Sequence, residues 1–325
     1  MPAARIHGGT DAAGPLPYDF SSNSNACGPC PAVAAAVQSA DASRYPDPSY
    51  TALRQTLADF HAVAPWRVVL AGSASEFILR MTAWAQRQGA ARVWLPPLAY
   101  GDYAHAAGVW GLPATAAIAQ AQLVWACEPS SPLGQAHTVW PERPVAGQHL
   151  VLDCAYAPLR LAGAASQVAV PHDALWCLWS PNKALGLTGV RAAYAIAPRQ
   201  AQQAAAELDA LAPSWVLGAH GVAMLQAWTL DTTQAWVAAC RPTLAAWKDA
   251  LQALLQARAW SCLPSEAHYF CARPPPSMDL AATLLALRQQ GIRLRDTQSM
   301  GLAGHVRLSA QPPGHRQALQ RALDG

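Results

Sequence analysis

Short apolar runs alternate, over the first two thirds of the chain, with longer segments whose apolar positions recur at helical spacing. The apolar runs are residues 68–70, 93–95, 123–126, 150–153 and 175–179. Residues 51–61 and 75–88 place apolar side chains three or four positions apart, which predicts helices. Buried strands that alternate with helices predict an α/β fold with a mostly parallel sheet. Ligands of such sheets bind beyond the carboxyl ends of the strands, where Asp153, Ser180 and Lys183 are expected.

The pattern changes near residue 213, after which helical spacing dominates and strands are few. The expected elements are helices over 235–257 and 279–290 and strands over 268–271 and 306–309. The first fifty residues are rich in Gly, Pro, Ser and Asn, which predicts an extended arm. We therefore expect an N-terminal arm over residues 1–50 that contributes to the small domain, a large domain over 51–213 and a small C-terminal α+β domain over 214–325.

The composition favours a folded protein and argues against several partners. Hydrophobic residues make up 52% of the chain and charged residues 13%, which is enough for a large core. The net charge of +3 comes from scattered side chains without a basic stripe, so nucleic acid is not an expected partner. No long apolar span or signal-like N-terminus is present in this sequence. We expect a soluble, cytoplasmic protein that does not bind a membrane.

The eight cysteines include one Cys-x-x-Cys pair, Cys27 and Cys30. A zinc site would need further ligands at suitable spacing, and a disulfide framework is typical of small secreted chains, so we expect no metal site. A redox pair remains an alternative. Reduced thiols without a chemical role are the favoured interpretation.

One lysine, Lys183, lies in a segment of small and apolar residues. The segment reads Ser-Pro-Asn-Lys-Ala-Leu-Gly-Leu-Thr-Gly-Val-Arg, with Ser180 three residues before the lysine and Arg191 eight residues after it. Apolar surroundings favour loss of the lysine's proton, and the serine and arginine can bind a phosphate group. An isolated Ser-x-x-Lys is usually a surface lysine in a loop. With its neighbours, the segment indicates a lysine that forms a Schiff base with pyridoxal phosphate (PLP).

Further segments accompany this lysine in a characteristic order along nearly the whole chain. They are His7-Gly8-Gly9, Asp19-Phe20-Ser21-Ser22-Asn23, Tyr45-Pro46-Asp47-Pro48, Asp153-Cys154-Ala155-Tyr156, and Arg295-Asp296 followed by Arg307. With this set the chain resembles the fold-type I PLP enzymes of the histidinol-phosphate aminotransferase group, and within it the L-threonine-O-3-phosphate decarboxylases of cobalamin biosynthesis. The resemblance implies the fold-type I PLP-dependent transferase fold, an α/β fold with a large domain around a mostly parallel seven-stranded sheet and a smaller α+β domain.

The resemblance also implies which residues hold PLP. The cofactor-binding positions are Ser73, Ala74, Ser75, Tyr100, Ser131, Asp153, Tyr156, Ser180, Lys183 and Arg191. Asp153 holds the proton of the pyridine nitrogen, Tyr156 hydrogen-bonds to the phenolic oxygen, and Tyr100 stacks on the ring. The segment 73–75, Ser180 and Arg191 surround the cofactor phosphate at the start of a helix. Without the resemblance, Asp153 fits a helix cap equally well.

Substrate binding and assembly follow from the same resemblance. The substrate-binding positions are His7, Asn23, Arg295 and Arg307, of which Arg307 binds the α-carboxylate and the other three bind a distal phosphate. Tyr45 matches a tyrosine that reaches the cofactor phosphate of the neighbouring subunit, which implies a homodimer with shared active sites. The implied reaction is PLP-dependent decarboxylation of L-threonine O-3-phosphate to (R)-1-aminopropan-2-yl phosphate, with Lys183 as the catalytic residue.

The chain departs from the pattern of this group in three places. A loop that reads Asn-Pro-Asn-Asn-Pro-Thr-Gly in the group is Glu-Pro-Ser-Ser-Pro-Leu-Gly at 128–134, which places Ser131 where an asparagine would contact the cofactor. Only eighteen residues separate Gly134 from Asp153, which leaves little room for a crossover helix and strand. Gly72-Ser73 also replaces the usual Asn-Gly pair at the phosphate loop.

Three alternatives stay open on these grounds. The first is a PLP aminotransferase that acts on a phosphorylated substrate of the histidinol-phosphate type and breaks the Cα–H bond, with Lys183 as base. The second is a PLP-fold binding protein with weakened catalysis, motivated by Ser131 and the short crossover. The third, a nucleotide-binding Rossmann-like enzyme, is disfavoured because no Gly-x-Gly-x-x-Gly follows a strand.

Overall fold

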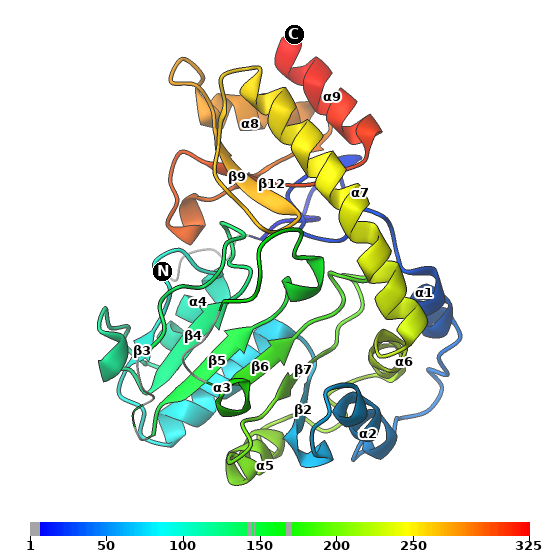
Figure 1. Ribbon diagram of the computed structural model, residues 1–325, viewed down its shortest axis with the longest axis vertical. Coiled ribbons are helices and arrows are strands. Elements are labelled where there is room, and N and C mark those ends of the chain that lie inside the picture. The colour runs from blue at the N-terminus through cyan, green and yellow to red at the C-terminus, as the bar shows by residue number, and fades with distance from the viewer. Residues whose placement is uncertain (1–6, 142–144, 146, 167–170) are drawn as a thin grey trace.

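The computed structural model describes residues 7–141, 145, 147–166 and 171–325. A six-stranded sheet forms the centre of the larger part of the molecule, in the order β2-β7-β6-β5-β4-β3 (Figure 1). Its strands are β2 (Val68–Ala71), β3 (Val93–Trp94), β4 (Leu123–Cys127), β5 (His149–Asp153), β6 (Trp176–Trp179) and β7 (Ala193–Ile196). The strands β3 to β6 run parallel, whereas β7 is antiparallel to both of its neighbours, β2 and β6. The predicted α/β fold with a mostly parallel sheet is thus confirmed.

The expected seventh strand is not formed as a strand in the described residues. Beyond β3, the chain makes a single parallel bridge from Val93 to Ala114, with hydrogen bonds from Val93 N to the Pro113 carbonyl and from Thr115 N to the Val93 carbonyl. Pro113 has no N–H to donate, which suits it to a sheet edge and not to a longer ladder. The prediction of seven strands is corrected to six strands and this one bridge.

Helices cover both faces of the sheet because its strands are apolar on both sides. On one face, Trp125 and Val151 pack against α3 (Ala74–Arg87), α4 (Gly101–Val109) and α5 (Gln202–Ala210). On the other face, Val124 and Leu150 pack against α1 (Pro31–Gln38), α2 (Thr51–Phe60), α6 (Ala219–Trp228) and the first half of α7 (Asp231–Gln256). Alternate residues of each strand therefore belong to two separate cores, as expected for a buried parallel sheet.

A smaller unit stands above the carboxyl ends of the strands and has its own core. It contains a four-stranded antiparallel sheet in the order β11-β12-β9-β8. Its elements are β8 (Ser261–Cys262), β9 (Tyr269–Arg273), α8 (Leu280–Gln289), β10 (Ile292–Arg293), β11 (Arg295–Asp296), β12 (Val306–Ser309) and α9 (Pro313–Asp324). The arm joins this unit, because β1 (Tyr18–Asp19) pairs in parallel with β10. The long helix α7 runs from the large unit into the small one (Figure 1), so the domain boundary expected near residue 213 stays a prediction.

One part of the chain, the N-terminal arm, differs from the sequence expectation. The arm is not extended throughout, because residues Pro31–Gln38 form α1. Pro31 occupies the first helical turn, where the missing N–H costs nothing, so a proline that suggested a loop in fact begins a helix. Among the described residues, none of the helices has the length and hydropathy needed to cross a lipid bilayer.

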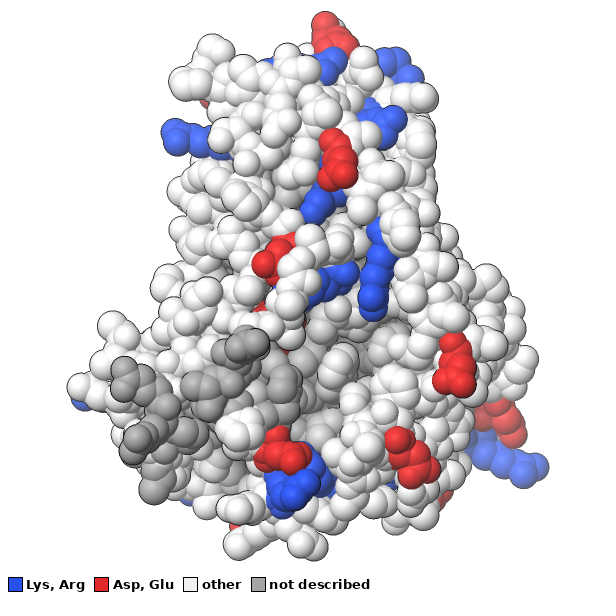
Figure 2. All heavy atoms as spheres, viewed as in Figure 1, with Lys and Arg blue, Asp and Glu red and all other residues white. Residues whose placement is uncertain are grey.

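Short 3-10 helices connect several of these elements. They are η1 (Pro65–Arg67), η2 (Ile118–Gln120), η3 (Ala157–Leu159), η4 (His172–Ala174) and η5 (Gln298–Met300). Charged side chains are sparse on the face shown in Figure 2, where lysines and arginines are scattered among acidic residues around a hollow between the two units.

Candidate active site

A cavity of about 1060 Å³ opens where the carboxyl ends of β4, β5 and β6 meet the N-terminal arm and the small unit. The predicted site residues that line it are His7, Asn23, Ser73, Ala74, Ser75, Tyr100, Ser131, Asp153, Tyr156, Ser180, Lys183, Arg191, Arg295 and Arg307. Of the predicted positions only Tyr45 lies outside the cavity. The fold thus brings fourteen separate predictions to one place, while the role of each residue stays a prediction.

Asp153 is the last residue of β5 and is buried beneath the cavity. Its Oδ2 accepts a hydrogen bond of 2.7 Å from the Tyr103 hydroxyl, and its Oδ1 accepts one of 3.0 Å from the Ala155 N–H. Burial raises the pKa of Asp153, whereas the Lys183 ammonium and the two hydrogen bonds lower it. A buried carboxylate held in this way can pair with a protonated ring nitrogen.

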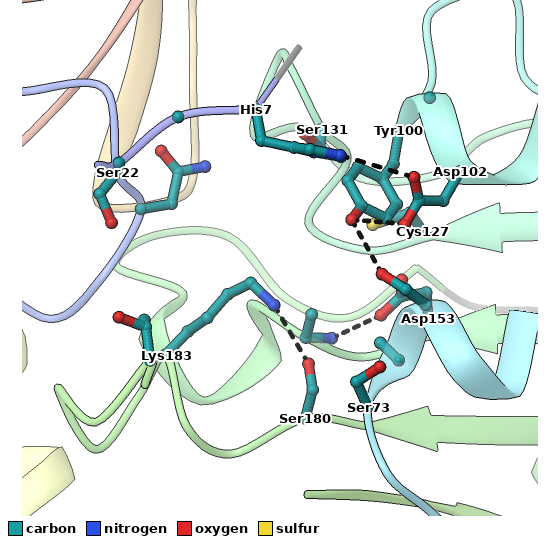
Figure 3. Close-up of a pocket in the computed structure, with 18 of the residues that line it drawn as sticks. His7, Ser22, Ser73, Tyr100, Asp102, Cys127, Ser131, Asp153, Ser180 and Lys183 are labelled. Carbon is teal, nitrogen blue, oxygen red and sulfur yellow. Dashed lines mark hydrogen bonds and ion pairs between the residues drawn. The ribbon is translucent and has the colours of Figure 1, made fainter. Parts of the chain in front are cut away.

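Lys183 lies in the turn that follows β6, with its side chain in the cavity (Figure 3). Its Nζ is 3.3 Å from the Ser180 hydroxyl oxygen and 5.5 Å from the centre of the Tyr156 ring. The N-terminal arm holds the turn from behind, because Asn25 N donates to the Lys183 carbonyl and Asn25 Nδ2 donates to the Ala184 carbonyl, both at 2.9 Å. The backbone of the lysine turn is therefore held by hydrogen bonds from the N-terminal arm, which is distant in sequence.

The turn that carries Lys183 requires a glycine at position 186. Its φ is +68°, and a Cβ at this position would lie 2.5 Å from the Gly28 carbonyl oxygen. Both the positive φ and the close approach of the arm exclude a side chain here.

The Cys-x-x-Cys pair lies in the same part of the arm but forms no bond. Cys27 and Cys30 are both free thiols. Burial and the neighbouring Cys240 raise the pKa of Cys27 to about 12. A thiol with so high a pKa is a poor nucleophile, which supports the interpretation of reduced, unreactive cysteines.

The N-terminus of α3 forms one wall of the cavity. Ser73 caps the helix by accepting a hydrogen bond of 3.1 Å from the Glu76 N–H, and Ala74 and Ser75 follow at the cavity surface. Ser180 and the exposed side chain of Arg191 line the same cavity. Backbone N–H groups at a helix start, hydroxyls and a guanidinium together suit a phosphate group.

Tyr100 and Asp102 face this wall from the start of α4, and His7 lies above them (Figure 3). The Tyr100 hydroxyl donates to Asp102 Oδ2 at 2.8 Å and lies 3.2 Å from the Ser75 hydroxyl. Burial raises the pKa of Tyr100, so its hydroxyl remains a donor. His7 Nε2 lies 3.8 Å from Asp102 Oδ1, and its ring centre lies 5.9 Å from that of Tyr100.

Two arginines of the small unit meet on the opposite side of the cavity. Arg295 of β11 and Arg307 of β12 are direct partners in the antiparallel pair. Arg307 donates to the Ser131 hydroxyl at 3.2 Å and to the Ser21 carbonyl at 3.0 Å, and Arg295 donates to the Asp296 carbonyl at 2.6 Å and to the Ser299 hydroxyl at 2.8 Å. Burial, together with the charge of Arg307, lowers the pKa of Arg295 to about 10. Two buried like charges side by side favour an anionic ligand next to them.

Asn23 supplies a further polar group to the cavity. Its side chain is buried, and neither its amide nitrogen nor its amide oxygen has a hydrogen-bond partner among the described residues. The backbone carbonyl of Asn23 is held by His268 Nε2 at 3.0 Å. Burial lowers the pKa of His268 to about 4, so the neutral ring donates from Nε2. The amide of Asn23 is thus available for a hydrogen bond within the cavity.

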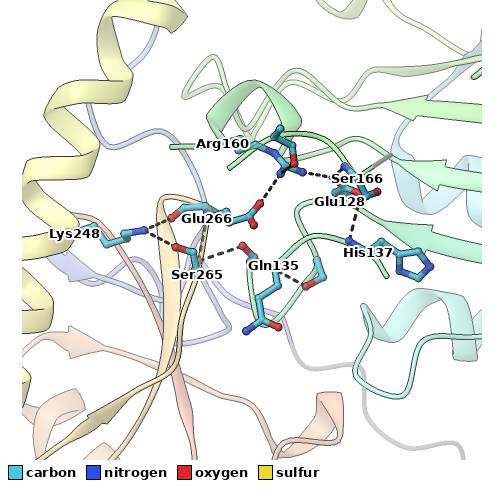
Figure 4. Close-up of polar contacts among 12 residues, drawn as sticks. Glu128, Gln135, His137, Arg160, Ser166, Lys248, Ser265 and Glu266 are labelled. Atoms are coloured by element: carbon cyan, nitrogen blue, oxygen red, sulfur yellow. Dashed lines mark hydrogen bonds and ion pairs between the residues drawn. The ribbon is translucent and has the colours of Figure 1, made fainter. Parts of the chain in front are cut away.

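The loop that carries Ser131 is fixed by charged groups behind the cavity (Figure 4). Arg160 pairs with Glu128, at the start of the loop, and with Glu266 of the small unit. Burial alone would raise the pKa of Glu128, but hydrogen bonds from Ser166 and the His137 N–H, with the charge of Arg160, lower it overall. The altered loop of this chain therefore ties the two units together.

Tyr45 lies on the outer surface, outside the cavity that the other predicted residues line. Its side chain is 76% exposed and stacks on the Trp215 ring with centres 4.4 Å apart. Trp215 Nε1 donates to the Pro46 carbonyl at 3.0 Å. An exposed pair of stacked aromatic rings suits contact with another chain.

The sequence interpretation missed Asp102 and Tyr103. Both lie in α4, which was not predicted because Gly101 and Gly108 interrupt a short alanine-rich segment. Tyr103 follows Tyr100 by three positions, so helical spacing would have placed the two on one face had the helix been recognised.

The sequence profile of the aminotransferase class I and II family matches residues 17–325. Histidinol-phosphate aminotransferase 2 of Rhizobium meliloti (strain 1021) is 28% identical over 328 residues, which cover 94% of this chain and 91% of that protein.

Solved structures show the same fold. The structure of histidinol-phosphate aminotransferase from Sinorhizobium meliloti in complex with pyridoxal-5'-phosphate matches with a TM-score of 0.74 and 20% identity, over 93% of this chain and 88% of that one. L-threonine-O-3-phosphate decarboxylase from Porphyromonas gingivalis matches with a TM-score of 0.78 and 18% identity, over 94% of this chain and 98% of that one.

Proposed function

The chain belongs to the aminotransferase class I and II family, and from this premise we propose that it is a PLP-dependent enzyme that decarboxylates L-threonine O-3-phosphate to (R)-1-aminopropan-2-yl phosphate. The observation that carries the proposal is the pair of adjacent, buried arginines, Arg295 and Arg307, at the end of the cavity away from the phosphate-binding wall. A phosphorylated α-amino acid has two anionic groups, a carboxylate and a phosphate, to match them.

The residues present fit PLP. The α3 N-terminus with Ser73 and Ser75 would hold its phosphate together with Arg191, and buried Asp153 would hold the proton on its ring nitrogen. When bound, PLP supplies a ring that accepts electrons from the substrate's α-carbon.

The side chains of this chain supply binding, orientation and proton transfer. Arg307, whose guanidinium is held by Ser131 and the Ser21 carbonyl, would bind the α-carboxylate in one orientation by a forked contact. Lys183 Nζ moves a proton at the substrate's α-carbon from its position beside Ser180. The arm and the small unit contribute residues to the cavity wall.

Histidinol-phosphate aminotransferase activity is the second candidate, favoured by the name of the 28% identical relative. That reaction breaks the Cα–H bond and uses the same lysine, carboxylate and phosphate-binding residues. The two reactions differ in which bond of the bound substrate stands perpendicular to the cofactor ring, which the arginine contacts determine.

The test is to load the purified protein with PLP, add L-threonine O-3-phosphate and measure carbon dioxide release together with the amine product. Stoichiometric carbon dioxide and product, both lost in Lys183→Ala, would support the decarboxylase. Transfer of an amino group from histidinol phosphate to 2-oxoglutarate, without carbon dioxide from threonine phosphate, would replace it by the aminotransferase. If neither reaction occurs and no visible absorbance of bound cofactor forms, the weakened binding protein becomes the better description.

We also propose a homodimer with shared active sites, in which Tyr45 reaches the cofactor phosphate of the neighbouring subunit. The exposed Tyr45–Trp215 stack supports this proposal, because tyrosine and tryptophan are enriched at interfaces between protein chains.

A further inference from the structure

Asp102 is, besides Asp153, a second buried carboxylate on the wall of a cavity that also contains Lys183 and three arginines. It lies in the first turn of α4 and is 3% exposed. Its Oδ2 accepts the Tyr100 hydroxyl, but its Oδ1 has no hydrogen-bond partner among the residues that the structure describes. A bare carboxylate in this position would repel a phosphorylated substrate.

A basic residue, His7, lies within ion-pair distance of that free oxygen, with Nε2 3.8 Å from Oδ1. The imidazole is 47% exposed, so the rest of the ring remains accessible. Figure 3 shows His7 reaching over Tyr100 towards Asp102 from the arm. The histidine therefore stands between the carboxylate and the open part of the cavity.

The path of the arm explains why His7 is presented there. A Cβ on Gly8 would lie 2.0 Å from the Ser21 carbonyl oxygen, so only glycine allows the arm to approach so closely. Gly9 has a φ of +92°, and its N–H donates to the Ser21 hydroxyl at 2.9 Å. The two glycines fix the chain next to His7 against the segment that also contacts Arg307.

We propose that Asp102 is a positioning residue that acts through His7 and makes the cavity accept a phosphate. The free Oδ1 pairs with Nε2 of the protonated imidazole, which leaves the Nδ1–H to donate to the phosphate of the substrate. A carboxylate that orients a histidine through one ring nitrogen while the other binds a ligand is a common arrangement. The inference rests on the proposed function, since it assumes a phosphorylated substrate.

The pairing gives Asp102 two opposite effects on an anion. With His7 present, Asp102 orients a cationic donor and favours phosphate. Without a basic residue at position 7, only the repulsion of the carboxylate remains. The sign of the effect of Asp102 on phosphate binding therefore depends on His7, which a merely structural role would not produce.

The test is a double-mutant cycle of Asp102→Asn and His7→Gln in the PLP-loaded, full-length protein. We expect Asp102→Asn to raise the KM for L-threonine O-3-phosphate about tenfold, and to lower that KM when introduced into the His7→Gln protein. An equal rise of KM in both backgrounds would overturn the proposal. So would a fall of KM in the protein that retains His7.

Two further variants test whether Asp102 acts through Tyr100 and whether an unrelated Asp→Asn substitution has any effect. Tyr100→Phe removes the hydrogen bond to Asp102 Oδ2 but keeps the ring, and if it reproduced the effect of Asp102→Asn, Asp102 would act through Tyr100 and the proposal would fail. Asp249→Asn, an exposed substitution of the same kind on α7, should leave KM unchanged.

A binding measurement distinguishes failure of this inference from failure of the proposed function. Inorganic phosphate is titrated into the PLP-loaded wild type and the three cycle variants by calorimetry. If the wild type does not turn over threonine phosphate, the proposed function fails. The same reversal of sign in phosphate affinity would still support the pairing of His7 with Asp102, and equal effects in both backgrounds would refute it.

Discussion

The hydrogen bond from Tyr103 to Asp153 allows a sharp prediction, because both side chains are buried and the change Tyr103→Phe removes a single atom. The hydroxyl donates to Oδ2 at 2.7 Å. The ring stacks on Trp125 with centres 4.9 Å apart and an angle of 13°, and phenylalanine keeps this contact. The variant therefore leaves the packing in place and leaves one buried carboxylate oxygen without its donor.

The expected loss follows from the charge of the acceptor. A hydrogen bond to a charged group contributes about 1.5–3 kcal/mol, so we expect the free energy of unfolding to fall by about 2 kcal/mol. With an unfolding entropy of about 2.1 cal/mol/K per residue, Tm falls by roughly 3 °C in a chain of 325 residues. The pKa of Asp153, already raised by burial, rises further when the donor is lost, so the charged carboxylate is less favoured and we expect PLP to be held less tightly.

The assay combines thermal unfolding of the cofactor-free protein with titration of PLP followed by visible absorbance. Tyr50→Phe is the matched control, because Tyr50 is also a buried tyrosine, its hydroxyl donates to the Leu217 carbonyl at 2.8 Å, and it lies outside the cavity. The control should lower Tm by a similar or smaller amount and leave the PLP affinity unchanged. If Tyr103→Phe weakened PLP binding no more than Tyr50→Phe does, Tyr103 would not act on the cofactor site through Asp153.

Three further predictions test other parts of the structure. The pKa of Glu128 is lowered in the folded protein, so its contribution to stability is present above its ordinary pKa and is lost as the pH falls through the folded pKa. Arg160→Met should weaken this loss of stability in acid, measured by urea unfolding as a function of pH. An unchanged pH profile would contradict a role for the Glu128–Arg160 pair. Gly186→Ala should abolish the visible absorbance of bound PLP, because a Cβ there meets a backbone carbonyl at 2.5 Å; normal absorbance would show that the turn adjusts. Mixing inactive Lys183→Ala with a weakened Tyr45→Ala should restore activity if subunits share sites, up to about a quarter of the wild type for random pairing, whereas no gain on mixing would refute sharing.

Much of the large unit was predictable because its information is local. The strands β2, β4, β5 and β6 are largely apolar segments of four or five residues. Because they run in the same direction, their carboxyl ends lie at the same side of the sheet. The site residues in the lysine segment and after β5 followed from these strand ends. A mostly parallel sheet follows from such a pattern, whatever the details of its edges.

The remaining features depend on contacts between distant segments. The hydrogen bond of Ser131 to Arg307 joins residues far apart in the chain, and nothing near Ser131 indicates it. The pairing of His7 with Asp102 requires the path of the arm, which two glycines and Ser21 determine. The number of strands was overestimated by one, because the segment with Pro113 at the edge of the sheet forms a single bridge and no strand.

The N-terminal arm has a consequence for the order in which the molecule is assembled. The Ser21 carbonyl accepts from Arg307, 286 residues later, and β1 pairs with β10 near the end of the chain. During synthesis, the residues of the arm therefore cannot form these native contacts until almost the whole chain has been made. Contacts of such long separation slow folding, since the entropy of closing the loop is lost before the contacts are gained. The large unit can fold first around its own sheet, and the cavity becomes a binding site only when the two ends of the chain meet above it.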